Sequence, residues 1–107
     1  YNAMMSAVGV GPGHELPHGT VYANADGAVA VCKPANGEAA CASNGATLGL
    51  KAKSYAEVDA WHAAGLANGG TACEDPPGVR DFGEKKLYLA YLRDPDGHKL
   101  CLLKAVS

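Results

Sequence analysis

Apolar and polar residues alternate along the last part of the chain with the period of two that is typical of β-strands. The alternating stretch Leu87–Ala105 is interrupted once, at the sequence Asp94-Pro95-Asp96-Gly97. Pro95 presets a turn φ angle, Asp94 can hydrogen-bond its own backbone, and Gly97 accepts a positive φ without steric cost. The pattern predicts a β-hairpin in which Asp94 to Gly97 form a four-residue loop.

The segment Ser54–Asn68 is predicted to be a helix. It begins with the capping-box spacing Ser54-x-x-Glu57 and is followed by Gly69-Gly70, which ends a helix. A strand at Ala46–Ala52 is predicted before it, and a looser extended stretch follows. The second half of the chain is therefore expected to be β-α-β-β-β. The extended stretch is assigned to Gly70–Pro76, and the residues from Pro76-Pro77-Gly78 to Glu84 to a loop.

The first half has a similar but shorter order. Tyr1–Val8 has the character of a helix that the following glycines end, and Thr20–Asn24 and Ala28–Lys33 are β-compatible runs joined at an Asp-Gly turn. The segment Pro34–Asn44 suits a connection between the halves. We therefore expect one α+β domain over 1–107, with a first β-α-β-β-β module over 1–40 that lacks its opening strand and a second over 44–107.

Two further expectations follow from the incomplete first module. A natural segment is expected to be missing before Tyr1, which is not an initiator methionine. A module that lacks a strand also leaves an unpaired sheet edge, so the protein is expected to form a homodimer.

The four-residue loop predicts which hairpin residues share a face. It pairs Arg93 with His98, Tyr91 with Leu100 and Tyr88 with Leu103. One face, expected beneath the helix, holds Leu89, Tyr91, Leu100 and Leu102. The other, expected to line a cleft, holds Tyr88, Ala90, Leu92, Lys99, Cys101 and Leu103, together with Thr47, Gly49 and Lys51 from the preceding strand.

Composition narrows the classes of partner and compartment. The 107 residues are 48% hydrophobic and 19% charged, with a net charge of −2 and nine scattered Lys and Arg residues. The negative net charge and the scattered basic residues exclude the basic surface that binding to nucleic acids or anionic membranes requires. No apolar run approaches the about 20 residues of a membrane span, and no signal peptide is evident, so a cytoplasmic protein is expected.

The four cysteines are separated too widely for a C-x-x-C motif, which argues against a zinc ribbon or a redox pair. We expect buried free thiols, with two disulfides in a secreted protein as the alternative. The cysteines are Cys32, Cys41, Cys73 and Cys101.

Five segments at their spacings resemble the glyoxalase/bleomycin-resistance/dioxygenase superfamily, also called vicinal oxygen chelate. They are Asn44–Leu50, Ala56–His62, Gly69-Gly70, Pro77–Arg80 and Tyr91–Gly97. The resemblance implies the glyoxalase/bleomycin-resistance fold, in which paired β-α-β-β-β modules curl around a cleft. It also implies that metal-dependent members carry a His on the first strand of a module and a Glu on the last. Those two positions fall on Thr47 and Cys101, so no metal and no other cofactor is expected here.

Six residues are candidate ligand contacts, each with a structural alternative. Thr47 offers a hydroxyl or is only a strand-forming residue, Tyr88 offers a ring or covers core, and Arg80 pairs with an anion or is solvated. Cys101 is interpreted as an inert cleft wall, Lys99 as a cleft residue that reaches water, and Tyr22, with His14 and His18, as the far end of the cleft. No catalytic residue is assigned.

The sequence thus predicts a small-molecule binding protein of the bleomycin-resistance kind. The alternative is a metal-dependent glyoxalase-like lyase or isomerase, or a ring-cleaving dioxygenase, with ligands from a missing strand or a partner chain. A structural interaction module is a third option.

Overall fold

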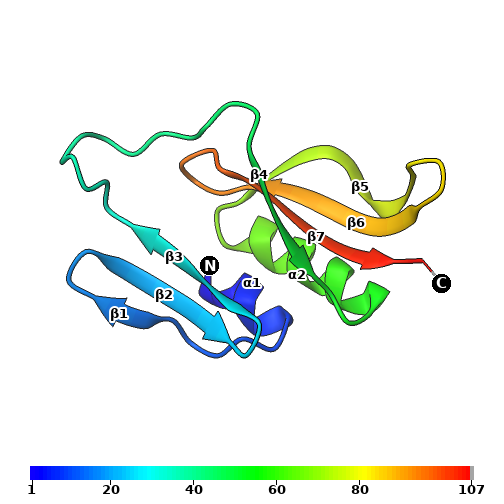
Figure 1. Cartoon of the computed structure of the whole chain (residues 1–107), viewed down its shortest axis with the longest axis horizontal. Coiled ribbons are helices and arrows are strands. Elements are labelled where there is room, and N and C mark those ends of the chain that lie inside the picture. The colour runs from blue at the N-terminus through cyan, green and yellow to red at the C-terminus, as the bar shows by residue number, and fades with distance from the viewer. Residues whose placement is uncertain (107) are drawn as a thin grey trace.

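The computed structural model describes residues 1–106, which form two helices and seven strands in two sheets (Figure 1). In chain order the elements are α1 (Asn2–Ala7), β1 (His14–Leu16), β2 (Gly19–Asn24), β3 (Gly27–Cys32), β4 (Thr47–Lys51), α2 (Tyr55–Ala67), β5 (Thr71–Asp81), β6 (Lys86–Arg93) and β7 (Lys99–Ala105). The α+β class and the β-α-β-β-β order of the second half are confirmed. The first half is α-β-β-β, and its short strand β1 had no predicted range.

The two sheets have related topologies. The first has the order β1-β2-β3 with antiparallel neighbours. The second has the order β4-β7-β6-β5, in which β4 runs parallel to β7 and the other neighbours are antiparallel. Within residues 1–106, β3 and β4 are therefore edge strands, and Figure 1 shows them on the sides of the two sheets that are turned toward each other.

Helix α2 begins and ends as its sequence predicts. The Ser54 side chain accepts a hydrogen bond from the Glu57 amide at 3.1 Å, and the Glu57 carboxylate accepts one from the Lys53 amide at 2.8 Å. At the other end, Gly69 has a φ of +96° and the Gly70 amide donates to the Gly65 carbonyl at 2.8 Å. These contacts satisfy backbone groups that the helix termini leave unpaired.

The main core lies between α2 and one face of the second sheet. Trp61 and Val58 of α2 are fully buried against apolar side chains of β6 and β7, and α1 adds Met4. Gly65 allows this packing, because a Cβ there would collide with the Leu92 side chain and lie 2.9 Å from the Met4 sulfur. The strand residues of the core are Ala90, Leu92, Leu100 and Leu102.

Tyr1 joins the two halves. Its hydroxyl donates to Oδ2 of Asp94, which is 7% exposed, at 2.6 Å. Its ring stacks on that of Tyr22, with the two ring centroids 6.1 Å apart, and the Tyr22 hydroxyl donates to Asn2 Oδ1 at 2.7 Å. Burial, followed by the bond to Asp94, raises the pKa of the Tyr1 hydroxyl. The chain start is thus held against the turn of the second half.

The predicted register of the β6–β7 hairpin is wrong by one residue. Arg93 pairs with Lys99 and Tyr91 with Cys101, so the loop is Asp94–His98. The Asp94 carboxylate stabilises this longer loop by accepting the amides of Asp96 at 3.0 Å and His98 at 2.8 Å. A slip of one residue exchanges the faces of a strand. The β7 faces are as predicted, but those of β6 are inverted.

The predicted loop from Pro76 to Glu84 is wrong for residues 78–81, whereas residues 82–84 lie in the turn before β6. Strand β5 continues to Asp81, which pairs with Lys86, and only the four residues 74–77 leave the ladder in a bulge. Figure 1 shows β5 as a strongly bent ribbon beside β6. Two consecutive prolines cannot donate to a ladder, which places the bulge there.

Neither helix of residues 1–106 has the length and apolar character needed to cross a membrane.

Candidate ligand site on the second sheet

The face of the second sheet that is turned away from α2, here called the outer face, brings together most of the predicted site. It carries Thr47 of β4, Lys99, Cys101 and Leu103 of β7, Leu89 and Tyr91 of β6, and Cys73 and Arg80 of β5. In the register, Tyr91 lies between Cys73 and Cys101 on its two neighbouring strands. Gly49 lies on the other side of Cys101 and adds no side chain there.

The centre of the outer face is apolar and shielded from water. Leu89 and Cys101 are 1% and 3% exposed, although neither belongs to the core beneath α2. They form a neutral, apolar floor beneath the other side chains of this face, and an apolar group of a ligand would lie above this floor.

Charged side chains surround this floor. The Lys99 ammonium lies 4.5 Å from the centroid of the Tyr91 ring and forms an ion pair with Glu74. The Arg80 guanidinium donates to the carbonyls of Asp75 at 2.9 Å and Pro76 at 3.0 Å. Because both carbonyls belong to the bulge, Arg80 fixes its shape.

The Cys101 thiol is neutral near neutral pH. Burial raises its pKa to about 11, and the Glu74 carboxylate acts in the same direction, while Lys99 and Arg80 oppose the shift. Burial also raises the pKa of the Tyr91 hydroxyl. A neutral thiol is a weak nucleophile and a weak metal ligand, so the chemistry offered here is recognition through cations, an aromatic ring and an apolar floor.

The outer face does not suit the divalent metal that the resemblance associates with metal-dependent proteins of that superfamily. Within residues 1–106, no three His, Cys, Asp or Glu side chains come together in a way that could hold a metal ion. At the two compared positions, Thr47 has a neutral hydroxyl and Cys101 a neutral thiol. The neighbouring charges of Arg80 and Lys99 would also repel a cation.

Two predicted site residues lie elsewhere. Tyr88 is on the α2 side of the sheet, where it pairs with Lys104, donates to Asp59 Oδ1 at 2.7 Å and stacks on Tyr55 at 4.6 Å. Its predicted place in the cleft is wrong, because it followed from the shifted register. Tyr22 is buried in the first sheet and hydrogen-bonded to α1, not in a cleft.

Sequence reasoning missed two residues of the outer face. Tyr91 was assigned to the core by the shifted register. Glu74, which reaches this face from the β5 bulge, was not assigned to the site, because no sequence pattern indicates that it reaches Lys99.

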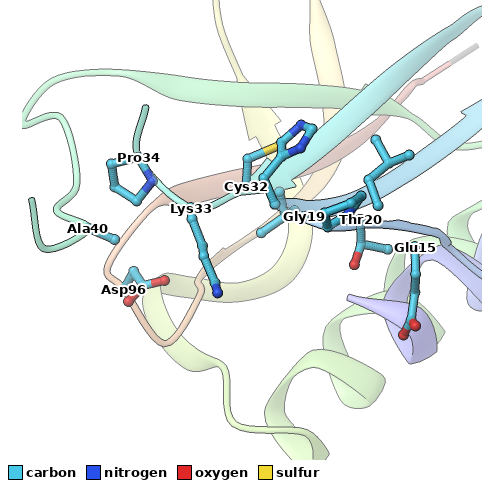
Figure 2. A pocket seen from close by; sticks show the side chains of 12 residues that line it. Glu15, Gly19, Thr20, Cys32, Lys33, Pro34, Ala40 and Asp96 are labelled. Atoms are coloured by element: carbon cyan, nitrogen blue, oxygen red, sulfur yellow. The ribbon is translucent and has the colours of Figure 1, made fainter. Parts of the chain in front are cut away.

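Two surface hollows lie outside the outer face. One, of about 580 Å³, is bordered by the β1–β2 turn, the end of β3 and the linker after it. Figure 2 shows Lys33 between Asp96 and Glu15 in this hollow. The other, of about 460 Å³, separates β3 from β4 and β7, and Lys99 is the one predicted site residue that borders it. We refer to this second hollow as the inter-sheet groove.

The fold and this face define a protein of the glyoxalase/bleomycin-resistance architecture. A crystal structure of a glyoxalase/bleomycin resistance protein from Albidiferax ferrireducens T118 shares 50% sequence identity and a TM-score of 0.93, over 96% of this chain and 83% of that one.

More distant structures share the fold. A glyoxalase-related enzyme from Fulvimarina pelagi is 21% identical, with a TM-score of 0.67 over 95% of this chain and 76% of that one. A glyoxalase/bleomycin resistance protein/dioxygenase family enzyme from Burkholderia phytofirmans PsJN is 15% identical, with a TM-score of 0.66 over 99% of this chain and 91% of that one. No family model and no curated protein matches the sequence. On the strength of the A. ferrireducens relative, the chain belongs to the glyoxalase/bleomycin resistance protein family.

Proposed function

We propose that the protein binds a small amphipathic anion on the outer face and does so without a divalent metal. The observation that carries this proposal is the grouping of Arg80, Lys99 and the Tyr91 ring around buried Cys101. Two cations suit an anionic group, and the ring with its apolar floor suits the remainder of the molecule.

Binding is favoured over catalysis because the groups on this face lack the properties that catalysis needs. The raised pKa of Cys101 leaves little thiolate to act as a nucleophile. Glu74, the carboxylate whose charge acts on Cys101, is paired with Lys99 instead of being free to take a proton.

The proposal is tested with a library of metabolites and antibiotics in a thermal-shift assay, because a ligand that binds only the folded protein raises its melting temperature. Each hit is measured again on Lys99→Ala and on the matched control Lys104→Ala. Both lysines are on β7, but Lys104 faces the α2 side through its pairing with Tyr88.

Loss of a charged hydrogen bond costs about 1.5–3 kcal/mol, so Lys99→Ala should weaken anionic hits by roughly 10- to 150-fold. Lys104→Ala should leave their affinity unchanged. Hits that are equally indifferent to both substitutions would show that the ligand does not bind on the outer face.

A further inference from the structure

Glu74 has an unusual backbone conformation for its residue type. Its φ is +59°, and within residues 1–106 it is the only residue other than glycine with a positive φ. A glutamate gains nothing locally from this left-handed conformation, so the surrounding structure must impose it. Glu74 is also the first of the four bulge residues that leave the ladder between Cys73 and Gly78.

The bulge is attached to the outer face at two points. At one, Arg80 donates to the backbone carbonyls of Asp75 and Pro76. At the other, the Glu74 carboxylate pairs with the Lys99 ammonium, which also lies over the Tyr91 ring. The first attachment uses backbone groups, whereas the second places a carboxylate where a ligand would meet the cation.

The Glu74–Lys99 pair is accessible from solvent. The Lys99 side chain is 24% exposed and that of Glu74 is 45% exposed. A pair that remains this accessible is only weakly stabilising and can exchange its anion for one from solution. A Glu74 side chain that leaves Lys99 also loses one of the contacts made by this residue in its left-handed conformation.

We propose that Glu74 is an internal competitor for the ligand: its carboxylate occupies Lys99 in the free protein, and a carboxylate of the ligand displaces it. This inference rests on the proposed function and narrows the ligand to a carboxylate attached to an apolar or aromatic group. The carboxylate takes the place of Glu74 on Lys99, and the apolar group packs beside Tyr91 above Leu89 and Cys101. Arg80 keeps the remainder of the bulge in position during the exchange.

The probe for this inference is benzoate, compared with its neutral analogue benzamide, in calorimetric or NMR titrations. The key variant is Glu74→Gln, which removes the competing charge and keeps the size of the side chain. Asp75→Asn is the matched control, since it removes a negative charge from the next residue of the same bulge without touching Lys99.

If the Glu74–Lys99 pair is closed about nine-tenths of the time, its removal raises the affinity for benzoate about ten-fold, because binding no longer requires a minor state. Asp75→Asn should change the affinity much less, and benzamide should respond to neither substitution. Adding Lys99→Ala to Glu74→Gln should abolish the gain.

The inference is overturned if the affinity of Glu74→Gln for benzoate is no higher than that of the unsubstituted protein. It is also overturned if benzoate does not bind Glu74→Gln at all. An equal gain in Asp75→Asn would overturn it too, because general charge repulsion would then explain the effect. The proposed function is decided separately, by whether library hits depend on Lys99. If library hits bind more weakly to Lys99→Ala but benzoate binds Glu74→Gln and the unsubstituted protein equally, the binding site on the outer face is supported. The role of Glu74 as an internal competitor is then rejected.

Discussion

The hydrogen bond from Tyr1 to Asp94 should be a main contributor to the attachment of the first half of the chain to the second. Replacing Tyr1 with Phe removes the hydroxyl that donates to Asp94 Oδ2 at 2.6 Å and keeps the ring that stacks on Tyr22. Hydrogen bonds to charged groups contribute about 1.5–3 kcal/mol. Because Tyr1 is only partly buried, we expect the lower part of that range, about 1.5–2 kcal/mol of unfolding free energy.

A double-mutant cycle with Asp94→Asn separates the contribution of this hydrogen bond from that of the bonds that Asp94 accepts from the turn amides. An asparagine oxygen can still accept the amides of Asp96 and His98, so the turn is retained while the charge facing Tyr1 is lost. We expect a coupling free energy of about 1 kcal/mol between the two substitutions.

Urea unfolding measures these changes through the fluorescence of Trp61, the single tryptophan, which is fully buried in the core. An unfolding free energy of Tyr1→Phe within about 0.5 kcal/mol of that of the unsubstituted protein is what an ordinary surface substitution gives. That result, or an absence of coupling to Asp94→Asn, would show that the hydrogen bond does not hold the two halves together.

Three further predictions concern the thiols, pH and assembly. At about pH 8, below the ordinary thiol pKa, iodoacetamide should modify exposed Cys32 and Cys41 well before Cys101, as judged by peptide mass spectrometry; equal rates would contradict the burial of Cys101. The pKa of the Tyr1 hydroxyl is raised in the folded state, so the folded protein holds this proton more tightly than the unfolded chain does. The stability that this difference contributes is complete below the ordinary tyrosine pKa of about 10 and is lost as the pH rises above 10. Tyr1→Phe should therefore make the loss of stability at alkaline pH less steep, and an unchanged slope in urea titrations would count against this. The open edges of β3 and β4 predict a homodimer at micromolar concentration, and a monomer in analytical sedimentation would remove this prediction.

The order of elements could be predicted because its signals are local. The capping residues of α2 and the alternation along β7 depend on neighbours a few positions away, and both are as expected in the structure. The alternation placed Lys99 and Cys101 on one face, and the same reasoning placed Thr47 beside them on β4.

The length of the hairpin loop could not be predicted in the same way. A four-residue loop and the observed five-residue loop both suit Asp-Pro-Asp-Gly, and the choice depends on how the Asp94 carboxylate meets the His98 amide and Tyr1. The resulting shift of one residue exchanged Tyr88 for Tyr91 in the candidate site. The contact between Glu74 and Lys99 could not be predicted from the sequence either, because it depends on the three-dimensional path of the β5 bulge.

Chemical-shift mapping with the strongest anionic library hit decides whether the ligand binds on the outer face. We expect the largest changes in the ¹H–¹⁵N spectrum at the amides of Cys73, Glu74, Tyr91 and Cys101, because these residues share the outer face with Lys99 or contact it there. Changes confined to residues 29–34 and 40, which border the inter-sheet groove, would instead place the ligand between the two sheets and rule out a site on the outer face.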